Sequence, residues 1–376
     1  MRKHLLISND FPPKVGGIQS YLWELWRRLP SEDFSVYTTP FLDDVGFDME
    51  QPFRIVRSTK KVLLPTPYIN RKVQKFSKEL GAELIVWDPA FPLGISAPKS
   101  RTSYAVVLHG AELAIPGKLP IAKSLLANTL KKASLVICAG TYPAEEAEKI
   151  AKQSLPLAII PPGVDIERFR PAVPGEKEKI RKDLKLPDTS PVLLALTRLV
   201  PRKGIDVLIE AVKILKKDYP ELLLLIGGIG RDLKRLKDLA RDSEENVRFL
   251  GEISEEFLPE LYRAADIFCM PCRSRWGGLE QEGFGIVFLE AASSGIPQIA
   301  GKSGGSSDAV SNNETGFIID DPRDPRQLAK SIESLLQDST RLELMGSNAR
   351  KRVEDHFSYE QLSKSLIEAL DSATLK

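Results

Sequence analysis

Cysteine and histidine are scarce in this chain of 376 residues, which has only three of each. An odd number of cysteines without regular spacing does not make a disulfide framework, and three histidines cannot supply a histidine-rich metal centre. Cys269 and Cys272 have C-x-x-C spacing, but they lie on an apolar run that predicts a buried strand entering a proline turn. We therefore assign them a structural role. With no D-x-D sequence either, we expect neither a metal nor a cofactor.

Long apolar runs are also absent. No run approaches the ~20 residues that a membrane-spanning helix needs, and the start "MRKHLLISNDFPP" lacks the apolar core of a signal peptide. With 42% hydrophobic and 28% charged residues, the composition excludes disordered, collagen-like and coiled-coil classes. We therefore expect a globular cytoplasmic protein.

The small net charge of +2 hides an uneven distribution. Residues 1–165 hold 21 Lys and Arg against 16 Asp and Glu, whereas the rest holds 32 against 35. Within residues 51–135 the balance is 14 basic to four acidic side chains. This pattern predicts a basic surface on the amino half.

Short apolar runs alternate with amphipathic stretches along the whole chain. Runs that are apolar on both faces are typical of parallel strands covered by helices, and 376 residues suit two domains. The sequence therefore predicts an α/β protein with two doubly wound parallel sheets, joined near the proline-rich residues 159–184, with ligands at the carboxyl ends of the strands. The predicted strands are HLLIS, ELIVW, YAVVLH, SLVICAG, PVLLAL, ELLLLIG, NVRFL, DIFCM, PQIA and GFII.

Two turns after predicted strands have residues suited to phosphate. In "NDFPPKVGGIQSYL", Gly16 and Gly17 allow close backbone approach just before a helix that begins near Ile18, although a plain tight turn explains them equally well. In "TRLVPRKG", Arg198 and Lys203 follow a strand five residues apart, which suits a diphosphate, and the alternative is a solvated basic loop.

A third stretch, "EQEGFGIVFLE", has acids at both ends of an apolar run. If residues 282–290 form one helix, the carboxylates of Glu282 and Glu290 lie ~12 Å apart along its axis, about the span from the sugar to the ribose of a nucleotide-sugar. Gly283 and Gly285 suit a helix N-terminus that meets phosphate, and Gly304 and Gly305 form a similar turn. The alternative is that both acids are ordinary helix charges, which fits Glu290 poorly among its apolar neighbours.

Two further features are weaker. Gly227, Gly228 and Gly230 follow a predicted strand, but their spacing is not G-x-G-x-x-G, so they support only a nucleotide near that turn. His109 ends an apolar strand in "VVLHGAEL". A lone histidine is usually structural, but the carboxyl end of a parallel strand favours a role in the site.

These stretches in this order resemble the retaining glycosyltransferases of family four, which have the GT-B fold of two facing Rossmann-like domains with a cleft between them. The resemblance covers nearly the whole chain and rests on "NDFPPKVGGIQSYL", "TRLVPRKG", "CRSRWGGLEQEGFGIVFLEAASSG", "GKSGG" and the E-x7-E spacing. It is strongest to actinobacterial enzymes that add mannose from GDP-mannose to phosphatidylinositol monomannoside. It implies an amino-terminal acceptor and membrane-side domain of residues 1–166 plus 358–376, and a donor domain of residues 167–357.

The resemblance also implies roles for residues. Glu282 would bind the donor sugar's hydroxyls and Glu290 those of the ribose, while Arg198 and Lys203 hold the diphosphate. His109 would lie beside the anomeric centre, which makes His109, Glu282, Arg198 and Lys203 the expected catalytic set. The expected donor-binding residues are Gly16, Gly17, Arg198, Lys203, Glu282, Gly283, Phe284, Gly285, Ile286 and Glu290.

Two positions depart from the pattern of these mannosyltransferases. Ala111 replaces a second histidine, and Trp276 stands where a small residue is usual. Both affect the acceptor or donor more than the reaction class. Since the carboxylates placed so far lie on the donor side, we expect same-face attack on the donor with retention, rather than a covalent intermediate.

Other functions remain open at this stage. A family-four enzyme with another nucleotide-sugar or acceptor fits the same residues, and so does a non-catalytic nucleotide-sugar-binding module. A nicotinamide-dependent oxidoreductase would also have Rossmann-like halves, but the glycine fingerprint is missing. No feature indicates nucleic-acid binding.

Two basic amphipathic stretches in the amino half suggest a peripheral membrane protein at the inner face of the plasma membrane. "RKVQKFSKEL" has basic residues around a stripe of Val73, Phe76 and Leu80, and "GKLPIAKSLLANTLKK" places lysines beside leucines. Helices packed on their own sheet are the alternative. We expect docking on anionic lipid, with a glycolipid acceptor.

Overall fold

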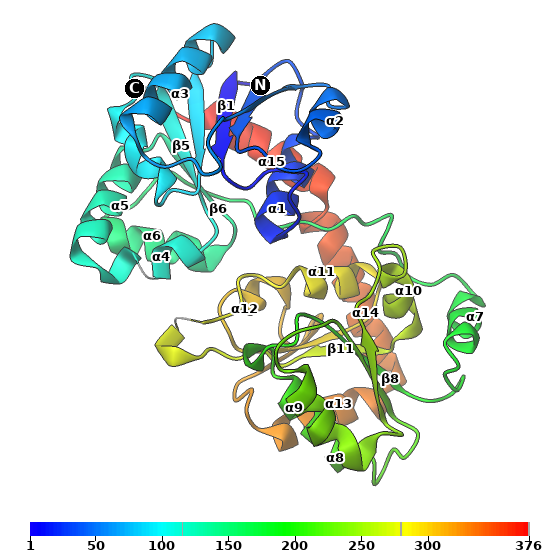
Figure 1. Ribbon diagram of the computed structural model, residues 1–376. Helices are drawn as coiled ribbons and strands as arrows, with labels where there is room; N and C mark the ends of the chain where they lie inside the picture. Colours follow the sequence, from blue (N-terminus) through cyan, green and yellow to red (C-terminus); the bar gives the residue numbers. More distant parts are fainter. Residues whose placement is uncertain (115, 279, 375–376) are drawn as a thin grey trace. The chain divides into compact units, whose positions relative to one another are not determined.

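The structure is a computed structural model that describes residues 1–114, 116–278 and 280–374. The chain forms two compact units (Figure 1). Unit 1 comprises Met1–Gly163 and Tyr359–Lys376, and unit 2 comprises Val164–Ser358. The limits predicted from the sequence, at 166 and 358, differ from these by three residues and by one.

In unit 1 the described residues form a parallel sheet in the order β3-β2-β1-β4-β5-β6-β7. Its strands are β1 (His4–Ser8), β2 (Phe34–Thr38), β3 (Arg54–Arg57), β4 (Leu84–Asp88), β5 (Ser103–Leu108), β6 (Leu135–Cys138) and β7 (Leu157–Ile159). Its helices are α1 (Gly17–Trp26), α2 (Asp44–Met49), α3 (Pro67–Leu80), η1 (Leu93–Lys99), α4 (Ala111–Ala114), η2 (Pro116–Lys118), α5 (Pro120–Lys132), α6 (Thr141–Ala151) and α15 (Tyr359–Ser372).

Helices cover both faces of this sheet because successive strand residues point to opposite sides. Leu5 and Ile7 of β1 belong to a buried cluster that includes side chains of α3, α5 and α6. Leu6, between them, belongs to a second cluster formed with α1 and α15. The carboxyl-terminal helix is therefore part of the core of unit 1.

Unit 2 repeats this design, with a parallel sheet in the order β10-β9-β8-β11-β12-β13 among its described residues. Leu193 and Ala195 of β8 face one cluster, with α8 and α13, while Leu194 and Leu196 face the other, with α10, α11 and α14. The strands are β8 (Val192–Leu196), β9 (Leu223–Gly227), β10 (Val247–Gly251), β11 (Ile267–Met270), β12 (Gln298–Gly301) and β13 (Gly316–Ile319). The helices are α7 (Glu176–Asp183), η3 (Pro201–Lys203), α8 (Ile205–Leu215), α9 (Leu233–Ala240), η4 (Arg241–Ser243), α10 (Leu258–Ala264), η5 (Trp276–Gly278), α11 (Ile286–Ser293), α12 (Ser306–Ala309), α13 (Pro325–Leu336) and α14 (Ser339–His356).

The structure corrects the expectation that the apolar stripe on α3 faces a membrane. Val73 is fully buried, and Phe76 and Leu80 pack against the same core cluster. The stripe therefore holds α3 on its own sheet. Within the described residues, no helix is both long enough and apolar enough to span a bilayer.

Candidate functional site

The loop after β8 turns Lys203 into the interior of unit 2. The short helix η3 ends at Gly204, whose φ is +72°, and a Cβ on Gly204 would lie 2.0 Å from the carbonyl oxygen of Pro271. A side chain at this position would collide with backbone, so glycine is required. The turn leaves Lys203 only 7% exposed.

Glu282 receives this lysine. Its Oε2 lies 2.7 Å from Nζ of Lys203 and 2.6 Å from Nη1 of Arg202, and its backbone N–H donates to Oγ of Ser303. Burial opposes ionisation of Glu282, but the charges of Lys203 and Arg202 outweigh it and hold the pKa of the carboxyl below its ordinary value. The result is a buried carboxylate held by two cations. Sequence reasoning missed Arg202, which directly precedes Lys203.

Glu290 and Arg198 line a separate hollow of about 600 Å³ in the same unit. The hydroxyl of Tyr262 donates to Oε2 of Glu290 over 2.6 Å. Burial raises the pKa of Glu290 to about 7, because its charged form loses hydration there. Arg198 is exposed, so its guanidinium is accessible to a ligand. The structure thus groups Arg198 with Glu290, and Lys203 with Glu282.

The glycines after β9 shape this hollow. Gly228 has a φ of +120°, and a Cβ there would lie 2.0 Å from the carbonyl oxygen of Thr197. A Cβ on Gly230 would lie 2.1 Å from the carbonyl oxygen of Leu199. Both glycines let this loop pack directly against the loop that holds Arg198. Gly227, Gly228 and Gly230 all line the hollow.

The single helix considered for residues 282–290 is wrong. Helix α11 begins at Ile286, after Gly285 with a φ of +86°, so Glu282 precedes the helix and the ~12 Å axial separation does not apply. The turn at Gly304 and Gly305 holds this preceding segment, because a Cβ on Gly304 would lie 2.0 Å from the carbonyl oxygen of Glu282. Phe284, which was expected among the donor-binding residues, is buried in the core of unit 2.

In unit 1, His109 follows β5 and pairs with a carboxylate at the end of β4. Its Nε2 lies 2.6 Å from Oδ1 of Asp88, which is fully buried, and Oγ of Ser8 donates to Oδ2 of the same carboxylate. Burial opposes protonation of His109, but Asp88 outweighs it and raises the histidine's pKa. When the ring is neutral with its proton on Nε2, Nδ1 keeps a free lone pair. Sequence reasoning missed Asp88, although its place after an apolar strand is the same signal that marked His109.

Gly16 and Gly17 stand at the start of α1. A Cβ on Gly17 would meet no atom within 4 Å, and one on Gly16 would lie 2.3 Å from Oε1 of the Gln19 side chain. Packing within the protein therefore does not require glycine at position 17. Gln19 donates to Oδ1 of Asp10 over 2.7 Å.

The two departures noted in the sequence lie in short loops. Trp276 is 64% exposed, in a left-handed conformation, with the guanidinium of Arg275 4.7 Å from its ring centroid. Ala111 opens α4, and its side chain is outside the described part of the structure. Cys269 and Cys272 are buried free thiols, and burial raises the pKa of Cys272 to about 12.

Comparison with known proteins identifies the family. The family described as "Glycosyl transferases group 1" matches residues 176–352, and "Glycosyltransferase Family 4" matches residues 15–168. A Mycobacterium tuberculosis protein named GDP-mannose-dependent alpha-(1-6)-phosphatidylinositol monomannoside mannosyltransferase is 35% identical over 98% of both chains. The chain belongs to the family-four glycosyltransferases. A Corynebacterium glutamicum member, named as the mannosyltransferase for the monoacylated acceptor, is 34% identical over 99% of this chain and 98% of its own.

Solved structures agree on the fold of this glycosyltransferase. HepE from Anabaena, in complex with UDP, has a TM-score of 0.82 at 22% identity over 98% of this chain and 100% of its own. A sucrose-phosphate synthase from Thermosynechococcus elongatus has a TM-score of 0.75 at 23% identity over both full chains. At these identities the likeness concerns the fold, which is the GT-B class expected from the sequence.

Proposed function

We propose that this glycosyltransferase moves a mannosyl residue from GDP-mannose to a glycolipid of the phosphatidylinositol mannoside type. Relatives that match 97% or more of the chain at 34–35% identity carry names that state this reaction, and this observation carries the proposal. The chemistry of the site supports it, because unit 2 combines accessible and buried cations with two carboxylates.

We assign the donor to unit 2. The hollow lined by Arg198 and Glu290 would take the nucleoside, with the ribose hydroxyls donating to Glu290 and Arg198 facing the diphosphate. Lys203 would also face the diphosphate. The Oε1 of Glu282, which accepts no hydrogen bond from the described residues, would accept from the sugar's hydroxyls. Backbone at Gly283, Gly285 and Ile286 would lie against the phosphates at the start of α11.

The nucleobase choice has a physical basis in the same hollow. Glu252 and Glu255 line it, and carboxylates only accept hydrogen bonds when ionised. Guanine presents two adjacent N–H donor groups on its pairing edge, whereas uracil presents one. Two carboxylates in the lining of the hollow therefore favour GDP over UDP.

The reaction would proceed on one face of the sugar. The bond from the anomeric carbon to the diphosphate oxygen breaks, a bond to the acceptor oxygen forms on the same side, and the leaving phosphate oxygen takes the acceptor's proton. Arg198 and Lys203 would stabilise the negative charge that develops on the diphosphate, which is the largest contribution expected. His109, in unit 1, would contact the acceptor.

The decisive experiment offers the purified protein a panel of GDP-mannose, UDP-glucose and UDP-galactose with phosphatidylinositol monomannoside. Mass analysis should show one added hexose with GDP-mannose only, and NMR of the product should show the donor's α configuration retained. Transfer from a UDP-sugar alone would overturn the donor assignment. Binding of GDP-mannose without any transfer to the lipid would identify a non-catalytic module.

Membrane docking belongs to the same proposal, with α5 as the contact in place of the α3 stripe. Leu119, Ile121 and Leu125 are exposed, at 54%, 80% and 44%, on and just before α5. Lys118 directly precedes Leu119, and Lys123 lies between Ile121 and Leu125 in the sequence. Apolar side chains next to lysines are typical of a helix at the surface of an anionic bilayer, where each basic residue contributes about 1 kcal/mol.

Co-sedimentation with vesicles tests docking. The protein should bind phosphatidylinositol-containing vesicles at low salt, bind less at high salt because the charges are screened, and bind less when Ile121 and Leu125 are changed to serine. The matched control changes Ile214 to serine, since it is an exposed apolar residue of unit 2 at 40%. No binding to anionic vesicles at low salt would exclude docking.

A further inference from the structure

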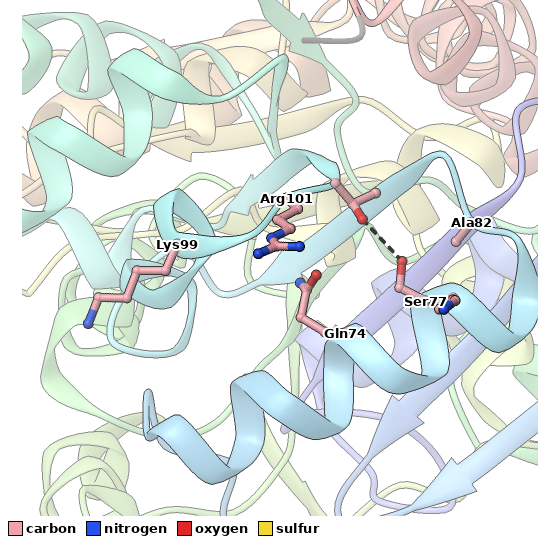
Figure 2. A pocket seen from close by; sticks show the side chains of 7 residues that line it. Gln74, Ser77, Ala82, Lys99 and Arg101 are labelled. Atoms are coloured by element: carbon pink, nitrogen blue, oxygen red, sulfur yellow. Dashed lines mark hydrogen bonds between the residues drawn. The ribbon is translucent and has the colours of Figure 1, made fainter.

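A basic hollow lies in unit 1 at the opposite end of the sheet from His109. It has a volume of about 560 Å³ and lies between α3 and the segment that leads into β5 (Figure 2). Thr102, on its wall, directly precedes β5, whereas His109 directly follows this strand. The hollow is therefore separate from the candidate acceptor site.

Three cationic side chains line this hollow, and none of the described residues contributes a carboxylate to it. They are Lys78 from α3, Lys99 from the end of η1, and Arg101. Among the described residues, none of these three side chains forms an ion pair or a hydrogen bond. The acidic residue of α3, Glu79, pairs with other cations. Its carboxylate lies 3.9 Å from Nη2 of Arg54 and 3.7 Å from Nζ of Lys75. The positive charges of the hollow are left without compensation by the protein.

Hydrogen bonds hold the walls in place. The side-chain amide of Gln74 donates to Oγ of Ser100 over 2.8 Å, and the same Oγ accepts from the backbone N–H of Thr102. The hydroxyls of Ser77 and Thr102 lie 3.5 Å apart. Figure 2 shows the guanidinium of Arg101 beside the Gln74 side chain, with Lys99 extending to one side. The segment that presents Arg101 is thus fixed to α3.

A second hollow of about 200 Å³ shares Arg101 and Thr102 with the first. Ser134 lines it and is 4% exposed, and within the described part of the chain its Oγ has no hydrogen-bond partner. A buried hydroxyl without a partner is costly, and a ligand oxygen would satisfy it. Lys132, at the end of α5, lines this hollow as well.

We propose that Lys78, Lys99 and Arg101 form a binding site for a phosphate-bearing anion, separate from the donor's diphosphate site. A guanidinium binds phosphate through two parallel N–H groups, and the two ammonium groups add point charges. The hydroxyls of Ser77 and Thr102 supply further donors. The volume accommodates a phosphate ester with an attached polyol, which describes both a lipid headgroup and a soluble sugar phosphate.

Calorimetry at low ionic strength tests the site with glycerophosphoinositol as the probe. The wild-type protein should bind it, and the variant Lys78→Gln/Lys99→Gln/Arg101→Gln should bind at least tenfold more weakly. The matched control, Arg71→Gln/Lys72→Gln/Lys75→Gln, removes the same charge from α3 outside the hollow and should keep wild-type affinity. Equal affinity in all three proteins, or equal losses in both variants, would overturn the proposal. Because the diphosphate site is unchanged in both variants, the comparison remains valid even if glycerophosphoinositol also binds there.

Vesicles distinguish the two sources of the phosphate. If the ligand is a lipid headgroup, the variant in the hollow should also lose binding to phosphatidylinositol vesicles, relative to the control. If the ligand is soluble, both variants should bind the vesicles equally while only the control keeps the affinity for glycerophosphoinositol.

Discussion

Glu282 in unit 2 and Asp88 in unit 1 are both buried carboxylates beside loops that follow strands, but they have different partners. Glu282 in unit 2 is held by the cations Lys203 and Arg202. Asp88 in unit 1 is held by Ser8 and His109. The ordinary pKa of a histidine lies near neutrality, so the charge of the His109–Asp88 pair should change with pH, whereas the carboxyl of Glu282 has a lowered pKa and should stay ionised.

Replacing Lys203 should cause the largest effect, because it removes a buried cation from the donor side. We expect Lys203→Ala to lower kcat/KM for GDP-mannose by 10² to 10³, about 3–4 kcal/mol, as loss of a preorganised charge-stabilising group does. Arg198→Ala should fall in a similar range. Steady-state kinetics with product detection by mass measures both.

Lys213→Ala is the control for these variants, since Lys213 pairs with Glu210 on the surface of α8. It should keep wild-type kinetics. Near wild-type turnover by folded Lys203→Ala and Arg198→Ala, with folding checked by circular dichroism, would contradict the diphosphate assignment.

Separating the two acids of unit 2 sharpens the comparison further. Glu290 lines the hollow with Arg198, whereas Glu282 does not. Glu290→Ala should therefore raise the Kd of free GDP by about 10- to 100-fold, the range for hydrogen bonds to a charged group. Glu282→Ala should leave that Kd nearly unchanged and impair only use of the nucleotide-sugar. Calorimetry with GDP decides, and equal losses in both variants would refute the assignment of ribose to one acid and sugar to the other.

The sequence was sufficient for the fold class, because most strands are continuous apolar runs. It missed β2, where Ser35, Tyr37 and Thr38 are buried although they are polar, and β3, which begins and ends with arginine. Burial of such residues depends on neighbouring strands and helices, which local periodicity does not report.

The site was predictable in part, for a similar reason. Residues marked by local chemistry, such as Glu282 and Lys203, do come together, but no local pattern predicted that Arg202 lies beside them. Asp88 meets His109 because β4 and β5 are neighbours in the sheet, and strand order is a long-range property. The predicted start of α11 was wrong for a local reason, since Gly285 before an apolar run is a recognisable helix boundary.

Glu290 in unit 2 differs from Glu282, because its pKa is raised rather than lowered, and its titration should be visible in stability. Its pKa in the folded protein is about 7, above the ordinary 4.5, so folding favours the protonated form. The stability from this proton is present below about pH 4.5 and is lost as the pH rises through 7. Glu290→Gln cannot titrate, so between pH 5 and 8 it should gain about 2–3 kcal/mol of unfolding free energy relative to wild type. Urea unfolding at several pH values measures this, and a pH-independent difference would contradict it.

The smallest effect should come from Asp88→Asn, which tests the pH response of His109 in unit 1. Asp88 raises the pKa of His109 above the ordinary 6.5, so the stability from protonated His109 is present below pH 6.5 and lost as the pH rises through the folded-state pKa. Asparagine keeps the shape but removes the charge, so the histidine's pKa should fall. The unfolding free energy of the variant should then decline less with pH above 6.5 than that of the wild type. The NMR titration of His109 gives the pKa directly, with Asp238→Asn, on the surface of α9, as the control that leaves it unchanged. An unaltered His109 titration in Asp88→Asn would show that the histidine is not governed by its buried carboxylate, and the contrast between the two units would then lose its basis.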